Sequence, residues 1–359
     1  MGRRNRKNKR RINSLLLLLL LTASMLVVST YAWFSTNREV SITGISAQVS
    51  AAAGLQISLD GEIWGSSVNV TADGLNTLNA NGVKNVYQWP TKLSPVSTDG
   101  SISGSDVAFY YGRLTTDGNG LTGVAAESAR TANDSGSSTS SSAKFIAFDI
   151  YLKNSSGLSA GDHLQLNVGS LVAADLENGG AADTGLEYSA RVGFLLYDDT
   201  EPLSAGGATV RTLAIGNNPV VSIWEPNYNQ HIQYVVDNDA RVTGLTHDFR
   251  TLGLTANAVT GATETLTGIN ASTVPQGENP AFAIPLTVKT SGTVGSATGE
   301  AATDLTSVTS ASTSLVLGQN TIMRARVYIW LEGQDPDCND TASTGKQIKF
   351  VINLSKPAE

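Results

Sequence analysis

Residues 144–153 read Lys144-Phe-Ile-Ala-Phe-Asp-Ile-Tyr-Leu-Lys153, and this stretch decides the fold. An apolar side chain stands at every second position from Ile146 to Leu152, so these side chains share one face of an extended strand. Such alternation is typical of a strand with one face on a core and the other toward solvent. The stretch therefore predicts a half-buried β-strand.

Two later stretches repeat the pattern. In residues 323–331 the inward set is Met323, Ala325, Val327, Ile329 and Leu331, whereas Arg324, Arg326 and Tyr328 point outward. In residues 347–354 the inward set is Ile348, Phe350, Ile352 and Leu354. Shorter strands are predicted over Val107–Leu114, Leu164–Val168, Tyr188–Tyr197, Val210–Ile215, Ile232–Val236 and Phe282–Lys289.

Many short strands with Gly, Asn and Asp between them, and little helical periodicity, indicate an all-β chain. We expect an antiparallel jelly roll or β-sandwich over residues 45–359, with long loop insertions near 115–143 and 200–315. Residues 1–32 precede it as a signal peptide or anchor helix, and residues 33–44 form an extended N-terminal arm.

The first 32 residues have the composition of an export leader. Seven Arg and Lys residues stand before position 12, and an apolar run that begins with seven leucines, Leu15–Leu21, follows them. Such a leader sends the chain across the cytoplasmic membrane and leaves its cationic end inside. Thr30 and Ala32 form an A-x-A-like site, which predicts cleavage by signal peptidase before Trp33. The alternative is an uncleaved anchor, because the apolar run can span a bilayer of roughly 30 Å.

Without the leader the chain is strongly acidic. The whole chain has 24 Lys and Arg against 31 Asp and Glu, and 17 of the cations follow position 32, which gives a net charge of −14. This balance argues against nucleic acid as a partner and favours solubility outside the cell. Cys338 is the only cysteine, so no intrachain disulfide forms. We expect a secreted, extracellular or cell-surface protein that meets the membrane only through its leader.

Directly after the leader the alternation changes phase. Val40 and Ile42 share one face, whereas Ile45 starts the opposite phase, with Gly44 at the change. A one-residue slip of this kind is produced by a β-bulge or a hinge. The arm either pairs with its own domain or adds to the sheet edge of a neighbouring subunit. Val40, Ile42, Gly44 and Ile45 are the candidate polymerisation strand.

The patterns that would indicate an enzyme fail in their context. Gly157-Leu-Ser-Ala-Gly161 has the spacing of a serine-hydrolase elbow, but a strand rather than a helix is predicted after it. The three histidines are far apart, and none begins a zinc-binding H-E-x-x-H motif. We expect no catalytic residues and a non-enzymatic role.

One short run has the character of a metal site. Asp335, Asp337 and Asn339 alternate as D-x-D-x-N, like the first half of a calcium loop. The EF-hand continuation is missing, because Asp340 and Lys346 stand where it needs Gly and Glu. Two hypotheses follow, a looser Ca²⁺ site and an acidic hairpin loop with no cofactor.

Two segments carry a resemblance to a known family. The leader ends Thr30-Tyr-Ala-Trp-Phe-Ser35 before an alternating strand, which resembles the TasA/camelysin group of secreted matrix-fibre proteins of Gram-positive bacteria. The segment Val327-Tyr-Ile-Trp-Leu-Glu-Gly-Gln-Asp-Pro-Asp-Cys338 is similar to a stretch of related surface proteins. The chain departs from the family where Thr36 and Asn37 replace an acidic residue, and its middle has no counterpart.

The resemblance implies cleavage by a SipW-type signal peptidase. It also implies a jelly-roll subunit that polymerises with itself into extracellular filaments of a biofilm matrix, by donating its N-terminal strand to the next copy. A second hypothesis is a membrane-anchored or secreted β-sandwich that binds carbohydrate or a host surface through loops around Trp64, Trp89 and Trp224. A glycosidase would instead need two convergent carboxylates, for example Asp199 with Glu225.

Overall fold

The structure is a computed structural model. It describes residues 40–41, 47–51, 54–83, 85–90, 92–98, 100, 102–114, 120–127, 143–155, 162–166, 170–181, 184–217, 219–227, 230–239, 242, 254–255, 266–268, 284–285, 316–338 and 347–355. The chain divides into two units, Met1–Asn37 and Arg38–Glu359, and the described residues all belong to the second. No helix within them is long and apolar enough to cross a membrane. The leader, with Thr30, Ala32 and Trp33, lies outside the described residues.

The sheet that holds residues 146–154 is here called the central sheet. Its antiparallel strands run in the order β16 (Val220–Trp224), β15 (Ala190–Pro202), β21 (Thr321–Leu331), β11 (Ile146–Asn154) and β3 (Leu55–Ser58), and β5 (Tyr87–Gln88) also pairs with β11. The pairing of β11 with β21 extends from Ile146 beside Ile329 to Asn154 beside Thr321. Two of the most clearly alternating stretches of the sequence are therefore neighbours.

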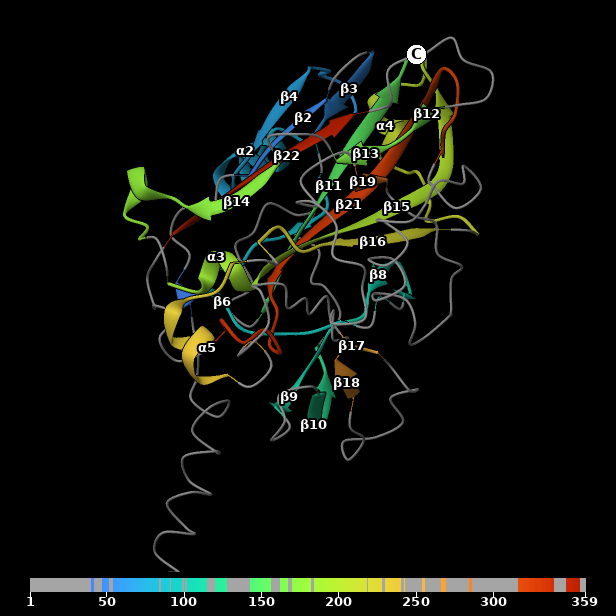
Figure 1. The fold of residues 1–359 in the computed structure, drawn as a ribbon. Coiled ribbons are helices and arrows are strands. Elements are labelled where there is room, and N and C mark those ends of the chain that lie inside the picture. The colour runs from blue at the N-terminus through green and yellow to red at the C-terminus, as the bar shows by residue number, and fades with distance from the viewer. Residues whose placement is uncertain are drawn as a thin grey trace, which may run out of the picture. The chain divides into compact units, whose positions relative to one another are not determined.

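A second sheet, here called the outer sheet, contains both ends of the domain. Its order is β19 (Ile284–Pro285), β13 (Gln165–Leu166), β22 (Ile348–Ser355), β2 (Ala47–Ala51) and β4 (Ser67–Val70), and β14 (Leu171–Ala174) also pairs with β22. Figure 1 shows β4, β2, β22 and β14 side by side. β2 is parallel to β22, with Ala47 beside Phe350 and Ala51 beside Leu354, and the other pairings of this sheet are antiparallel.

One hydrophobic core joins the two sheets. Both sheets contribute alternate side chains to it: Ala47, Val49, Val70, Val172, Ile348, Phe350, Ile352 and Leu354 from the outer sheet, and Leu55, Ile57, Ile146, Phe148, Ile150, Leu152, Val192, Phe194, Leu196, Met323, Ala325, Val327, Ile329 and Leu331 from the central sheet. The inward sets expected from the alternation are all in this cluster. The all-β prediction is confirmed, with few helices and mostly antiparallel sheets.

The central sheet is buried on its second face as well. Val96, Val107 and Phe109 pack there against Tyr328 and Trp330. The rings of Phe109 and Phe145 stack with centroids 4.2 Å apart, and Trp330 meets Phe109 edge-on at 5.2 Å. The expectation of half-buried strands is therefore wrong here, since Arg324, Arg326 and Tyr328 point away from the main core and are buried all the same. Arg326 and Tyr328 lie under residues 105–107, and Arg324 donates to the carbonyl of Leu213.

Several short elements surround the two sheets. β1 (Val40–Ser41) pairs with β6 (Lys92–Leu93), β7 (Ile102–Ser103) with β8 (Asp106–Val107), and β12 (Asp162–His163) with β20 (Val316–Leu317). β9 (Tyr110–Leu114), β10 (Gly120–Ala126), β18 (Leu266–Gly268) and β17 (Leu254–Thr255) form a small sheet. The helices are α2 (Ala72–Ala80), η1 (Leu176–Asn178), α3 (Leu186–Ser189), α4 (Gly207–Val210) and α5 (Gln233–Asn238). α2 begins where the Thr71 hydroxyl caps the N–H of Gly74 at 3.0 Å.

The stretch 200–315, expected as an insertion, begins inside the main fold. Its first residues end β15, and β16 belongs to the central sheet. The strands predicted over Val210–Ile215 and Ile232–Val236 are wrong, because α4 ends at Val210 and α5 occupies most of the second range. Most of residues 243–315 lies outside the described residues, as does most of the insertion expected near 115–143.

Candidate functional site

Three strand ends of the central sheet meet around one buried arginine. Arg191 is the second residue of β15 and stands beside Trp330 of β21, while Glu225 follows the last residue of β16. Residues 332–338 form the loop after β21. Because the strands are antiparallel, the start of β15 lies beside the ends of its two neighbours, and residues distant in sequence come together.

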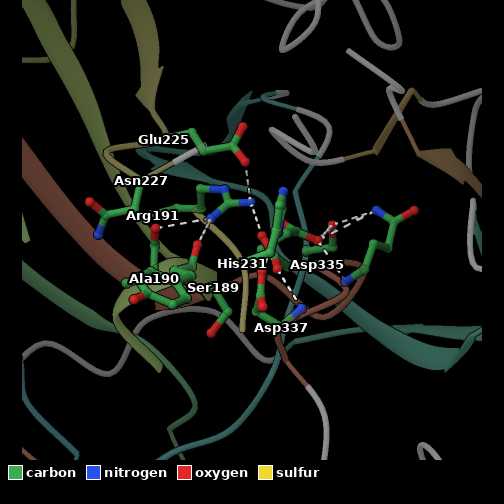
Figure 2. A network of polar contacts seen from close by, with 12 residues as sticks. Ser189, Ala190, Arg191, Glu225, Asn227, His231, Asp335 and Asp337 are labelled. Carbon is green, nitrogen blue, oxygen red and sulfur yellow. Dashed lines mark hydrogen bonds and ion pairs between the residues drawn. The ribbon is translucent and has the colours of Figure 1, made fainter. Parts of the chain in front are cut away.

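The Arg191 guanidinium is completely buried and saturated with acceptors. Its Nη2 donates to Glu225 Oε1 at 2.8 Å and to Asp335 Oδ2 at 2.5 Å (Figure 2). Its Nη1 donates to the carbonyl oxygens of Tyr188 and Ala190, both at 3.0 Å. A buried guanidinium is tolerated when charged partners and hydrogen bonds replace its hydration, and Arg191 has both.

His231 and Asp337 form a second ion pair beside the first. His231 Nδ1 lies 2.5 Å from Asp337 Oδ2, and Asp337 Oδ1 accepts from the N–H of Ile232 at 2.9 Å. Burial raises the pKa of Asp337 to about 6, although the hydrogen bond with His231 acts in the opposite direction. Burial lowers the pKa of His231, but the hydrogen bond to Asp337 and the negative charges around it outweigh burial and raise that pKa.

Glu332 is a third buried acid of this group. It accepts hydrogen bonds from the Ser97 hydroxyl and from Trp330 Nε1 at 3.2 Å, and the backbone N–H of Gln334 donates to it at 3.2 Å. Burial raises the pKa of Glu332 more than Arg191 and these hydrogen bonds lower it. We call Arg191, Glu225, His231, Glu332, Asp335 and Asp337 the Arg191 cluster.

The calcium candidates Asp335 and Asp337 lie in this cluster, and Asn339 lies outside the described residues. Each of their four carboxylate oxygens accepts a hydrogen bond, since Asp335 also accepts from the N–H of Asp337 at 2.8 Å. No group of three or more His, Cys, Asp or Glu residues with the arrangement of a metal site occurs in the described part of the chain. In the structure these carboxylates bind the loop after β21 to β15, through Arg191, and to the start of α5, through His231 and Ile232.

A second charged group lies on the covered face of the central sheet. Asp149 stands directly opposite Arg326, which donates from Nε to Oδ1 at 2.7 Å and from Nη2 to Oδ2 at 3.1 Å. Arg324 donates to the same Oδ2. Burial raises the pKa of Asp149, but the two guanidinium charges outweigh burial and hold that pKa below its ordinary value.

This group also fastens the β7–β8 hairpin to the sheet. Arg326 Nη1 and the Tyr328 hydroxyl both donate to Asp106 Oδ1 at 2.8 Å. The Tyr197 ring lies 4.9 Å from the Arg324 guanidinium and 5.7 Å from that of Arg326, which adds a cation–π contact. We call Asp106, Asp149, Arg324, Arg326 and Tyr328 the Asp149 cluster.

No protein-family model, curated protein or solved structure matches the chain.

The structure places the aromatic residues of the binding hypothesis in two settings. Trp89 is 5% exposed and Trp224 is 2% exposed, and both belong to the main core. Trp64 is partly buried, and Lys153 Nζ lies 5.1 Å from the centre of its ring. Two of the three tryptophans are therefore packing residues rather than parts of a binding surface.

The other sequence-predicted sites are also accounted for. Val40 lies on β1 beside Leu93 of β6, whereas Ile42, Gly44 and Ile45 lie outside the described residues. Asp199 accepts from the N–H of Ala214 at 3.2 Å, whereas Glu225 is paired with Arg191, so each carboxylate has its own task. The serine of Gly157–Gly161 is outside the described residues.

Sequence reasoning missed the Arg191 and Asp149 clusters. A lone arginine at the start of the apolar run 191–197, and a lone aspartate within the apolar run 145–152, were the available signals. Neither signal identifies the residues that pair with it, because those residues lie on other strands and only the register of the sheet brings them close.

Proposed function

We propose that this chain is the structural subunit of an extracellular or cell-surface filament, and that its N-terminal arm links one subunit to the next. The observation that carries the proposal is the pairing of β1 with β6, in which the end of the arm docks on the domain through Val40 beside Leu93 and Ser41 beside Lys92. In a filament the same pairing would be made by the arm of a neighbouring copy. Exchange of an identical element between copies is a low-cost route to assembly.

β1 is suited to exchange because, among the described residues, it belongs to neither sheet of the sandwich. β1 pairs with β6 alone over two residues, whereas the next strand, β2, lies inside the outer sheet between β22 and β4. β2 also supplies Ala47 and Val49 to the main core. A short ladder can open while β2 stays in place, so release of the arm leaves the core closed.

The receiving segment is held rigidly by the central sheet. Leu93 is buried in the main core, and on either side the chain is fixed by β5 on β11 and by the N–H of Val96, which donates to the carbonyl of Leu331 at 3.0 Å. A fixed acceptor lowers the ordering cost of binding an incoming strand. Main-chain pairing of this kind is the basis of strand-addition assembly.

The finer assignment of the fold is part of the same proposal. We assign the sandwich to the jelly-roll type, on the ground that the chain alternates between its sheets: β2 lies in the outer sheet, β3 in the central sheet, β4 in the outer sheet again, and β22 closes the outer sheet. We also propose export by the leader and cleavage between Ala32 and Trp33 by a SipW-type signal peptidase, which frees the arm. N-terminal sequencing of material released by the native cells tests the cleavage.

A disulfide across the β1–β6 pair tests the exchange. Ser41→Cys with Lys92→Cys places two thiols on facing residues, at a Cα separation of about 4.5–5.5 Å that suits a disulfide. The only native cysteine, Cys338, is buried. Oxidised filaments are expected to give a ladder of covalent oligomers on a denaturing gel. Dilute monomer is expected to form the disulfide within one chain and to give no ladder. Ser41→Cys with Asn69→Cys, on the exposed side of β4, is the matched control that gives neither.

Deletion of residues 33–43 from the mature protein gives the second test. We expect the filaments seen by electron microscopy to disappear while the thermal unfolding of the domain is unchanged. Filaments that persist in the deletion variant, or a bond that stays within one copy in intact filaments, would refute the proposal. Binding on a glycan array by a protein that never polymerises would favour the carbohydrate-binding alternative.

A further inference from the structure

The sequence contains three Asn-Gly pairs, Asn81-Gly82, Asn119-Gly120 and Asn178-Gly179. At such a pair the backbone nitrogen of the glycine can attack the side-chain carbonyl carbon of the asparagine. A five-membered succinimide forms and ammonia leaves, and water then opens the ring to aspartate or isoaspartate. Glycine favours the attack because it has no Cβ to hinder the approach. The structure describes two of the three pairs in full, and they differ in the group that must attack.

At Asn81-Gly82 the attacking N–H is occupied. Gly82 donates to the carbonyl of Asn79 at 3.1 Å, and the N–H of Asn81 donates to the last turn of α2. The next N–H, that of Val83, donates to Leu78 at 3.0 Å. Three successive amides therefore hold this pair to the end of a nine-residue helix. The helix end must open before the nitrogen of Gly82 can react.

At Asn178-Gly179 the attacking N–H is free. Asn178 ends a three-residue 3-10 helix, a form with poorer hydrogen bonds than the α-helix, and both residues are exposed. Within the described residues the Gly179 N–H makes no well-formed hydrogen bond. Gly179 has a φ of +93°, and no atom lies within 4 Å of where a Cβ would stand. The nitrogen is therefore open to reaction.

We propose that Asn178 is a site of spontaneous deamidation, and that it reacts faster than Asn81. The reaction needs only water: Gly179 nitrogen bonds to Cγ of Asn178, and the Cγ–Nδ2 bond breaks and releases ammonia. Water then cleaves one of the two imide bonds of Gly179 nitrogen, the bond to Cγ to give aspartate or the bond to the backbone carbonyl carbon of Asn178 to give isoaspartate. The product carries one more negative charge. The hydrogen bond that Gly82 must give up corresponds to a rate difference of about five- to tenfold between the two sites.

Deamidation of Asn178 is expected to disturb the turn in which it lies. Asn178 Nδ2 donates to Asp175 Oδ2 at 2.8 Å, and a carboxylate at that position would replace this bond by repulsion between like charges. Gly180 packs tightly, since a Cβ there would lie 2.6 Å from backbone atoms of Asp175 and Gln347. Asp175 in turn donates to the carbonyl of Gln347, just before β22, at 2.9 Å. An isoaspartate lengthens the backbone inside this tight turn and disturbs the edge of the outer sheet.

Peptide mapping by mass spectrometry tests the proposal on the intact mature protein aged at mildly alkaline pH. We expect the peptide with Asn178 to gain the mass that separates an acid from an amide about five to ten times faster than the peptide with Asn81. Asn178→Gln is expected to abolish that product and leave the change at Asn81 as it was. Asn81→Gln is the matched control, in which the Asn178 product accumulates at the normal rate.

A denaturant series separates the effect of structure from that of sequence. In unfolding concentrations of urea the two sites are expected to react at similar rates, because both are Asn-Gly and the helix of Asn81 is gone. An Asn178 that stays intact while Asn81 converts would overturn the proposal. A rate ratio that is the same in the folded and unfolded protein would overturn it as well.

Discussion

The Asp149 cluster and the Arg191 cluster are both buried on the central sheet, but their charges are arranged in opposite ways. In the first, two guanidiniums meet on the fully buried carboxylate of Asp149, and Arg326 also pairs with the less buried Asp106. In the second, the single guanidinium of Arg191 meets the carboxylates of Glu225 and Asp335, with Glu332 and Asp337 close by. A carboxylate left without a partner can neutralise itself by binding a proton, whereas a guanidinium cannot lose one in a protein.

The two clusters therefore respond differently to pH. The arginines hold the pKa of Asp149 below its ordinary value, whereas burial raises the pKa values of Glu332 and Asp337. A lowered carboxyl pKa stabilises the fold above the ordinary pKa and is lost on acidification. A raised one contributes stability that is complete below the ordinary pKa and is lost as the pH rises through the folded value. The first cluster is weakened by acid and the second by base.

The largest effect is expected for Asp149→Asn. The substitution keeps the size of the side chain but leaves Arg324 and Arg326 buried without their main counter-charge. We expect the free energy of unfolding, measured by urea titration, to fall by about 3–5 kcal/mol. Glu62→Gln, which removes an ion pair with Arg211 at a half-exposed carboxylate, is the control and is expected to cost about 1 kcal/mol or less.

A triple variant removes the three charges that meet at Asp149. Asp149→Leu with Arg324→Met and Arg326→Met replaces these three charges by apolar groups of similar size and leaves Asp106 hydrogen-bonded to the Tyr328 hydroxyl. Because buried ion pairs are costly to desolvate, we expect this triple variant to be more stable than Asp149→Asn. If Asp149→Asn lowered the free energy of unfolding no more than Glu62→Gln does, the two guanidiniums would have found other partners.

Arg191→Met is expected to have the next largest effect. It leaves Glu225 and Asp335 buried without their cation, and we expect a loss of about 2–4 kcal/mol near neutral pH. Near about pH 5 the loss should shrink, because burial already raises the pKa of Glu332 and the variant removes the Arg191 charge that lowers it, so this buried carboxyl binds a proton. Urea titrations at the two pH values measure it. Equal losses at both, or a similar relief for Asp149→Asn, would erase the proposed difference between the clusters.

The smallest effect is expected for Asp337→Asn and concerns the slope of stability with pH. The pKa of Asp337 rises from 3.8 to about 6, so its contribution is complete below 3.8 and is lost as the pH rises through about 6. The raised pKa of His231 acts in the same direction, with a loss above its ordinary 6.5. In the amide variant the free energy of unfolding should decline less between about pH 4 and 7, by up to about 3 kcal/mol, and the melting temperature should follow.

His231→Gln is the companion variant for this measurement. It removes the second titrating group and keeps a side chain that can still donate to Asp337. We expect the part of the decline that His231 causes above its ordinary pKa of 6.5 to disappear, because only the carboxyl then titrates. A slope identical to that of the unchanged protein in both variants would place the pH dependence outside the Arg191 cluster.

The strands that supply the core were predictable from the sequence, since alternation fixes which side chains share a face. The inward sets of β11, β21 and β22 follow from that pattern alone. The burial of the opposite face was not predictable, because Asp149 and Arg326 look like solvent-facing residues until the register places them opposite each other. The covering segment, residues 96–109, carries no signal that it packs on these particular strands.

The helix α5 shows a different limit. Ile232–Val236 has the composition of a short strand, but Asp337 accepts the N–H of Ile232 just before the helix begins. This cap comes from a residue 105 positions away. Local propensity cannot include a partner that only the folded chain brings near. The same reason hid the Arg191 cluster, whose members come from three strand ends.

The parallel pairing of β2 with β22 determines how the domain responds to tension. The arm enters beside Ala47 and the chain leaves after Ser355, at opposite ends of the paired strands. A force that pulls the two ends of the chain apart would act along these strands, across the hydrogen bonds that join them. All the bonds of the ladder would then share the load and have to break together, rather than open one after another. The domain would therefore resist a pull on the two ends of its chain more strongly than one whose hydrogen bonds open in turn.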